Sequence, residues 1–201
     1  MRGAKQILTA AILVAGLAAC SPAPTPSPTE VTAPATVAPT AAHKVDVPGA
    51  FAAAVPVTWK QASFDTQAIA HSTVLVYFST EPISNPCARI PATANCPPFA
   101  VDRLQPDGVL VTWTGYGVGG GQVDWTQGEA VTVGGRTGRA VVGAADADCS
   151  GIIGERQMVA RIQGSSAGDP NYTEMRACYL GPDLGTTEAQ LRAMLASVTW
   201  H

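Results

Sequence analysis

The sequence predicts an α+β fold: an antiparallel β-sheet with an amphipathic helix packed on it at the C-terminus, after a disordered tether. Short runs of β-branched and aromatic residues, separated by glycine and other turn residues, predict a series of strands. Neighbouring runs are close enough to form hairpins, and the last segment has the apolar spacing of a helix. Strands that follow one another before a terminal helix are typical of the α+β class.

The expected strands share this composition and lie at residues 51–57, 73–78, 109–113, 130–133, 136–142, 157–162 and 173–180. Segment 73–78 is continuously apolar, β-branched and aromatic, which predicts a central strand covered on both faces. Asp107-Gly108 predicts a turn, and Gly134-Gly135 predicts a hairpin turn with positive φ. The proline-rich residues 82–99 are expected to form a long loop, and the glycine-rich residues 115–121 a flexible one.

The side chains of the last two expected strands define a hairpin register. If paired residue numbers sum to 335, Ala160 lies opposite Met175 on one face and Arg161 lies opposite Glu174 on the other. Opposed apolar residues inside and an opposed ion pair outside both stabilise a sheet, and together they support this register.

The C-terminal segment is expected to be the helix. Thr187 followed by Gln190 fits a capping box at its start. The apolar residues then recur at intervals of three and four and form one stripe that would face the sheet, made of Leu191, Met194, Leu195 and Val198.

The N-terminus has the layout of a secretory signal. Arg2 and Lys5 precede the apolar or small run Ile7–Ala19, which is interrupted only by Thr9. At 1.5 Å per residue this run reaches about 20 Å, short of the roughly 30 Å hydrocarbon core of a bilayer. It is therefore a poor permanent membrane span.

The end of this run, Leu17-Ala18-Ala19-Cys20, resembles the lipobox of bacterial lipoproteins. The resemblance implies that a diacylglycerol is attached to the Cys20 sulfur and that the chain is cleaved before it. More than one acyl chain on one residue would anchor the protein stably. The alternatives are a simple secretory signal with an incidental cysteine and a buried terminal helix.

Residues 21–42 are expected to be an extended tether. They contain six prolines and five threonines but one charged residue, Glu30, so they cannot bury enough apolar surface to fold. The threonines beside prolines are candidate O-glycosylation sites, and an unmodified linker is the alternative. The expected organisation is a signal peptide at 1–19, the lipidated cysteine and linker at 20–42, and one domain at 43–201.

Once Cys20 is assigned to lipidation, an even number of cysteines remains: Cys87, Cys96, Cys149 and Cys178. Outside the cytoplasm such a set predicts disulfides, and three pairings are possible. We favour Cys87–Cys96, which closes a small loop, and Cys149–Cys178, which ties the start of the late hairpin to its end. Free thiols and a zinc site are alternatives, although the set lacks the Cys-x-x-Cys spacing of zinc sites.

The opening Pro56-x-x-Trp59, the series of strands and the final amphipathic helix resemble small actinobacterial lipoproteins with a PsbP-like fold. This resemblance rests on the order of the elements. It implies a fold and transfers no functional residue.

One motif is compatible with hydrolase chemistry. Residues 164–168 match the Gly-x-Ser-x-Gly elbow with Ser166 as nucleophile, and Asp183 and His201 follow in hydrolase order. The elbow requires a strand-to-helix turn, whereas here Asp169-Pro170 and a strand follow. We therefore interpret the motif as a hairpin tip and assign no catalytic residue.

Two further motifs could bind ions. Residues 146–151 resemble the first half of a calcium loop but lack the bidentate glutamate, since Gln157 occupies that position. Residues 115–121 lack the Lys-Ser/Thr of a phosphate loop. Tyr116 and Trp125 around this segment could line a groove, and the alternative is that they belong to the core or its rim. The histidines are far apart in sequence and are not expected to share a metal: His43, His71 and His201.

These observations predict a lipid-anchored, non-catalytic protein on the extracytoplasmic face of the cell membrane, with no cofactor and no metal. Its partner would be a protein, glycan or lipid of the envelope. Loss of Arg2 and Lys5 with the signal changes the formal charge from −3 to −5, which argues against nucleic acid. Two alternatives remain open: a carrier of an apolar ligand between sheet and helix, and a hydrolase using Ser166.

Overall fold

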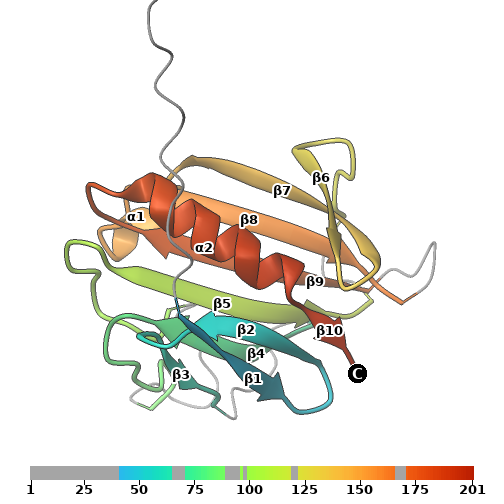
Figure 1. Cartoon of the computed structure of the whole chain (residues 1–201), viewed down its shortest axis with the longest axis horizontal. Helices are drawn as coiled ribbons and strands as arrows, with labels where there is room; N and C mark the ends of the chain where they lie inside the picture. Colours follow the sequence, from blue (N-terminus) through green and yellow to red (C-terminus); the bar gives the residue numbers. More distant parts are fainter. Residues whose placement is uncertain (1–40, 65–70, 89–95, 97–98, 119–121, 166–170) are drawn as a thin grey trace, which may run out of the picture. The chain divides into compact units, whose positions relative to one another are not determined.

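The computed structural model describes residues 41–64, 71–88, 96, 99–118, 122–165 and 171–201 (Figure 1). Residues 37–201 form one compact unit. The expected signal peptide, Cys20 and the expected tether up to residue 40 lie outside the described residues. The fold is α+β, with antiparallel sheets and a C-terminal helix, as the sequence predicts.

A large sheet of seven antiparallel strands has the order β3-β4-β5-β9-β8-β7-β6. Its strands are β3 (Lys60–Ala62), β4 (Ser72–Ser79), β5 (Val109–Tyr116), β6 (Glu129–Val133), β7 (Arg136–Ala144), β8 (Arg156–Gln163) and β9 (Tyr172–Tyr179). The expected strands from residue 73 onward are all present, and only the short β3 was not expected. Because β5 continues to Tyr116, the glycine-rich stretch begins inside a strand and not as a flexible loop.

The remaining strands form a second, small sheet that the sequence analysis did not foresee. It contains β1 (Ala42–Val47), β2 (Phe51–Pro56) and β10 (Thr199–Trp200), in the order β1-β2-β10. β1 begins at Ala42, in the last residue of the expected tether, because its backbone pairs with β2 along its whole length.

The register of the late hairpin is confirmed. Every pair between β8 and β9 sums to 335, including Ala160 with Met175 and Arg161 with Glu174. The turn at Gly134-Gly135 is also confirmed, with φ of 55° and 81°. The expectation for β4 holds in part, since only Val76–Ser79 is buried. β3 pairs with that half alone, so the first half of β4 lies at the edge of the sheet.

The C-terminal helix, α2 (Leu184–Ala196), starts earlier than the expected capping box. The carboxylate of Asp183 caps it by accepting from the backbone N–H of Thr186 at 3.2 Å. Thr187 therefore lies inside the first turn, and the capping-box prediction is wrong. Three stripe residues of the helix are buried, whereas Val198 is buried beyond the helix end at Ser197.

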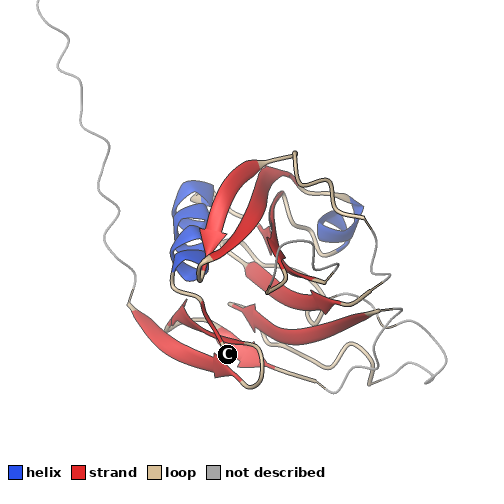
Figure 2. Cartoon of the chain, turned by 90° about the vertical axis from the view of Figure 1, so that its right-hand side faces the viewer, coloured by secondary structure: helices blue, strands red, loops and turns tan. Residues whose placement is uncertain are grey.

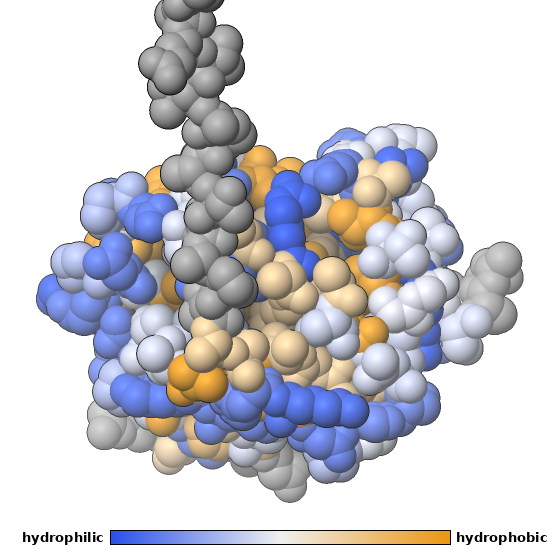
Figure 3. Space-filling view, viewed as in Figure 1, coloured by the Kyte–Doolittle hydropathy of each residue, from blue (hydrophilic) through white to orange (hydrophobic). Residues whose placement is uncertain are grey.

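Two cores lie on opposite faces of the large sheet. The larger one lies between this sheet, α2 and the small sheet, and the smaller one lies under residues 99–104 and the one-turn helix α1 (Ala147–Gly151). Figure 2 shows α2 and the small sheet on one side and α1 on the other. The outward side of α2 exposes mainly small residues, which give the pale and tan area over the helix in Figure 3: Gly185, Ala189, Ala193 and Ala196, with Arg192 among them.

Candidate functional site

Among the described residues, the loop 99–104 covers one half of the large-sheet face opposite α2. There, residues 99–104 bury Tyr77, Leu110 and Cys178 in the smaller core. On the other half, the strand registers align polar and aromatic residues that alternate with the core residues of β5, β9, β8 and β7. We call this half the polar face; it consists of Thr114, Tyr116, Arg139, Arg161, Gln163, Tyr172, Glu174 and Arg176.

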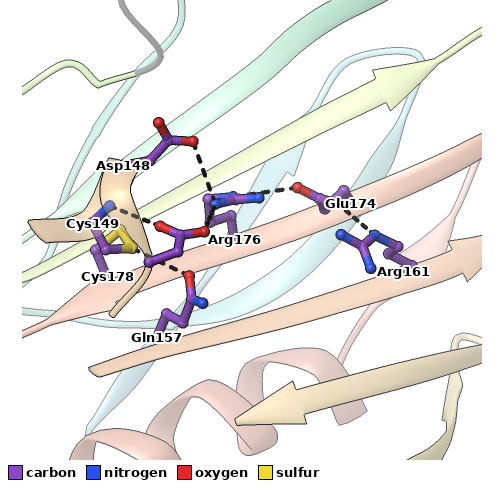
Figure 4. A network of polar contacts seen from close by, with 8 residues as sticks. Asp148, Cys149, Gln157, Arg161, Glu174, Arg176 and Cys178 are labelled. Atoms are coloured by element: carbon purple, nitrogen blue, oxygen red, sulfur yellow. Dashed lines mark hydrogen bonds and ion pairs between the residues drawn. A yellow bond between two sulfur atoms is a disulfide. The ribbon is translucent and has the colours of Figure 1, made fainter. Parts of the chain in front are cut away.

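A buried carboxylate lies at the centre of the polar face (Figure 4). The side chain of Glu174 is only 8% exposed and lies between two guanidinium groups. Arg161 Nε donates to Glu174 Oε2 at 2.8 Å, and Arg176 Nε donates to Glu174 Oε1 at 3.4 Å. The two positive charges offset the cost of burying the carboxylate. The ion pair that the sequence placed on an outer face is therefore buried at its carboxylate and partly exposed at Arg161.

Arg176 also links the sheet to α1. Its Nη1 atom lies 2.5 Å from Asp146 Oδ2 and 3.7 Å from Asp148 Oδ2. Asp146 is the N-cap of α1, and its Oδ1 atom accepts from the Cys149 N–H at 3.0 Å. Partial burial opposes ionisation of Asp146, but the Cys149 N–H and the Arg176 guanidinium outweigh it and hold the pKa of Asp146 below its usual value.

This geometry bears on the calcium-like motif at residues 146–151. The two aspartates that the sequence offers as ligands face a guanidinium group, which supplies the positive charge they need. Among the described residues, no group of three or more histidine, cysteine or acidic side chains is arranged to hold a metal ion.

The four domain cysteines form the two disulfides that we favoured. Cys149–Cys178 joins α1 to β9, with 5.3 Å between the Cα atoms, and both residues are buried. Cys87–Cys96 closes a loop of the proline-rich segment, with 5.1 Å between the Cα atoms. The Cys149–Cys178 disulfide fixes α1 to β9, the strand that carries Arg176 (Figure 4). It therefore holds Asp146 and Asp148 beside the arginine.

Three aromatic rings gather at one end of the polar face. Tyr116 and Tyr172 are cross-strand partners. Their rings are stacked, with centroids 4.5 Å apart and an angle of 6° between the ring planes. The rings of Trp125 and Tyr172 form a T-shaped pair with centroids 6.4 Å apart. Arg139 Nε donates to the backbone carbonyl oxygen of Trp125 at 2.7 Å and so fixes Trp125 in place. Burial, reinforced by the Glu174 carboxylate, raises the pKa of Tyr116 to about 12. The phenol therefore stays neutral at physiological pH.

Two of the three hydrolase candidates, Asp183 and His201, lie in different contacts of the described structure. Ser166 lies outside the described residues. Asp183 caps the start of α2, and His201 follows the end of this helix and contacts Asp46, with 2.7 Å between Nε2 and Oδ1. The 13 residues of α2 span about 20 Å from Asp183 to the helix end, and β10 lies between that end and His201.

Tyr116 and Tyr172 of the polar face also line a pocket, and a second pocket lies beside α1. One, of about 430 Å³, opens at the end of β5 and β9 and reaches Arg136, Trp200 and His201. The other, of about 600 Å³, lies between residues 84–88 and α1. Neither of these two pockets is lined by a described residue of α2.

Part of this site could be predicted from the sequence. Tyr116 and Trp125 were candidate groove residues, and Arg161 was paired with Glu174. Tyr172, Arg139 and Arg176 were not predicted. The signal was present for Tyr172, because its alternation with Thr173 and Glu174 places it on the same face as the predicted ion pair. The contact between Arg176 and Asp146 depends on the packing of α1, which no local pattern reports.

Comparisons of the chain with protein-family models, with curated proteins and with solved structures found no match. The fold and site define the class: a disulfide-bonded α+β protein with two antiparallel sheets. Disulfides form and persist in oxidising environments, which indicates an extracytoplasmic location. Among the described helices, none is both long and apolar enough to cross a bilayer.

Proposed function

We propose that this protein is a lipid-anchored, non-catalytic binding module on the extracytoplasmic face of the cell membrane. The polar face is the observation that supports a binding role. Its tyrosine, tryptophan and arginine side chains are the types enriched where proteins bind partners. They are held in place by the stacking of Tyr116 on Tyr172 and by the ion pairs of Glu174. Preordered side chains lower the entropic cost of binding.

The anchor rests on the N-terminal sequence. The lipobox-like residues 17–20 direct lipidation to Cys20, and the tether then separates the domain from the bilayer. Because Ala42 belongs to β1, the tether is residues 21–41, and at about 3.1 Å per residue it reaches roughly 65 Å when extended. The two disulfides support the same location, because they persist on the oxidising side of the membrane.

Membrane fractionation tests the anchor. The unaltered protein is expected in the membrane fraction, with a mature N-terminus at Cys20 that carries acyl chains by mass spectrometry. Cys20→Ala should release the protein or leave its signal uncleaved, whereas the neighbouring Ser21→Ala should change nothing. Membrane retention of a processed Cys20→Ala protein would contradict the anchor.

Site-specific photocrosslinking in intact cells tests the binding role. Val141 is 43% exposed and lies on the outward side of β7 beside the polar face, while Val57 is 53% exposed and follows the small sheet. A photoreactive residue at position 141 is expected to form an adduct with an envelope component, and one at position 57 is not. Equal labelling at both positions, or none at either, would contradict a binding surface at this place.

A further inference from the structure

The open part of the polar face holds an excess of positive charge. Arg139 and Arg161 are direct partners across β7 and β8 and lie on the same face of the sheet. Like charges placed opposite each other destabilise a sheet unless a counter-charge lies between or beside them. Among the described residues, the carboxylate that pairs with Arg161 is Glu174, which Arg176 shares.

Arg139 itself has no acidic partner within 4.0 Å among the described residues. Its guanidinium donates to the carbonyl oxygens of Trp125 at 2.7 Å and Gly128 at 3.3 Å. Both contacts are to neutral acceptors, so its charge is not neutralised. A guanidinium has five N–H donors in a planar fork, and a carboxylate matches this fork with two parallel hydrogen bonds.

Aromatic rings adjoin the two arginines. Trp125 is half-buried, its carbonyl oxygen accepts from Arg139, and its ring plane is nearly perpendicular to that of Tyr172. An indole or phenol ring offers an apolar surface with a polar group at its rim. A pyranose ring has the complementary character, because its C–H groups form apolar patches and its hydroxyl groups donate and accept hydrogen bonds.

The size of the open surface favours a small ligand. From Tyr116 on β5 to Arg139 on β7 the surface crosses three strand spacings, or about 14 Å. Residues 99–104 cover the other half of this face. A stable protein interface buries roughly 800 Å² on each partner, which requires a broader surface than this one.

We propose that the polar face binds a short acidic saccharide, with a carboxylate of the sugar received by Arg139 and Arg161 and a sugar ring against Trp125. This inference rests on the proposed binding function and names its ligand class. The saccharide supplies the negative charge that Arg139 lacks among the described residues, and it leaves the ion pairs of Glu174 with Arg161 and Arg176 in place.

Calorimetric titration of the full-length protein in detergent tests this proposal. The probe is trigalacturonic acid, and its fully methyl-esterified form has the same rings without the charges. We expect the acid to bind at least tenfold more tightly than the ester, and its affinity to fall as the ionic strength rises. Equal affinity for the two probes, or no binding of the acid, would overturn the proposal.

Variants locate the site. Arg161→Gln and Trp125→Ala should each weaken binding of the acid at least tenfold, whereas Arg192→Gln, the same charge change on the exposed side of α2, should leave it unchanged. Circular dichroism checks that each variant is folded, and Arg139→Gln replaces Arg161→Gln if the latter unfolds. Equal weakening by Arg192→Gln would show a non-specific charge effect and overturn the proposal.

The failure of this inference is distinguishable from failure of the binding role. Adducts formed at position 141 with a protein, together with tighter binding of a hexa-aspartate peptide than of the trisaccharide, would reject the saccharide and leave the binding surface standing. Absence of adducts at position 141 would reject both.

Discussion

Glu174 shows how a single residue organises the polar face. Its carboxylate is buried and meets Arg161 and Arg176 on its two oxygens, so each oxygen has a charged donor. The pairing with Arg161 could be predicted, because residues that face each other across a hairpin follow from the register. Its burial could not, since residues from outside the hairpin contribute to it. The predicted pairing of Arg161 with Glu174 is therefore confirmed, whereas the predicted exposure of Glu174 at the surface is wrong.

Replacement of this carboxylate should be costly. Glu174→Gln keeps the shape but leaves two half-buried guanidinium groups without their shared counter-charge, and we expect a loss of about 3 kcal/mol in the free energy of unfolding. Urea denaturation measures this loss. Glu129→Gln is the matched control, because Glu129 pairs with Arg192 at the surface with 60% of its side chain exposed, and its loss should stay below about 0.5 kcal/mol. Equal losses would show that Glu174 is not effectively buried in solution.

Asp146 should make stability depend on acidity. Its pKa is lower in the folded state than in the unfolded chain, so it stabilises the fold above its unfolded pKa and this contribution disappears as the pH falls through the folded value. Asp146→Asn keeps an N-cap for α1 and removes the charge. The variant should be less stable than the unaltered protein at pH 5, by less than about 1 kcal/mol because the side chain is 36% exposed.

Denaturation at several pH values tests this expectation. The stability difference should shrink between pH 4 and pH 2, as the unaltered carboxylate becomes protonated. A difference that stays constant over this range would mean that the Arg176 contact does not depend on ionisation.

At the scale of the elements, most of the large sheet follows from the sequence. Runs such as Val109–Trp113 and the glycine pair at 134–135 carry local signals that do not depend on the rest of the chain. In the small sheet only β2 carries such a signal, and the strand expected at 51–57 is confirmed as Phe51–Pro56. β10 has two residues, and β1 alternates exposed and buried positions only over Lys44–Val47. Both form because β2 offers them a partner, which is information outside their own residues.

The start of α2 gives a direct test of the helix boundary. Asp183→Ala removes the capping carboxylate and should lower the free energy of unfolding by about 1 kcal/mol. Thr187→Ala should have almost no effect, since Thr187 lies in the first turn and alanine is the better helix former. Thermal unfolding of the two variants measures the contrast. The reverse order would place the helix start at the capping box that the sequence suggested.

For the whole molecule, Trp200 joins the two sheets. Its ring contacts Phe51 of the small sheet and Trp113 of the large sheet, with centroids 5.8 Å and 6.4 Å away. Its Nε1 atom donates to the Val133 carbonyl oxygen at 2.8 Å, and the Arg136 guanidinium lies 4.2 Å above the ring. No local pattern marks this residue as a junction, because every partner is distant in sequence.

Loss of this junction should weaken the domain as a unit. Trp200→Ala removes the ring contacts and should cost about 2–3 kcal/mol, less than for a fully buried tryptophan because the residue is partly exposed. Trp200→Phe keeps a ring and loses the N–H donor, so it should cost about 1 kcal/mol. Calorimetry measures both losses. Two separate unfolding transitions in the unaltered protein would contradict a single cooperative unit.

Because β2 pairs with β10, the small sheet can be completed only at the end of synthesis. Ala52 can pair with Thr199 only after the ribosome has added the 147 residues that follow Ala52 in the chain. At 5–20 residues per second, synthesis of that interval takes about 7–30 s. During this delay the apolar side of β2 has no final neighbour, and slow folding is typical of such long-range pairings. Until residues 199–200 are available, the apolar side of β2 is therefore exposed to aggregation.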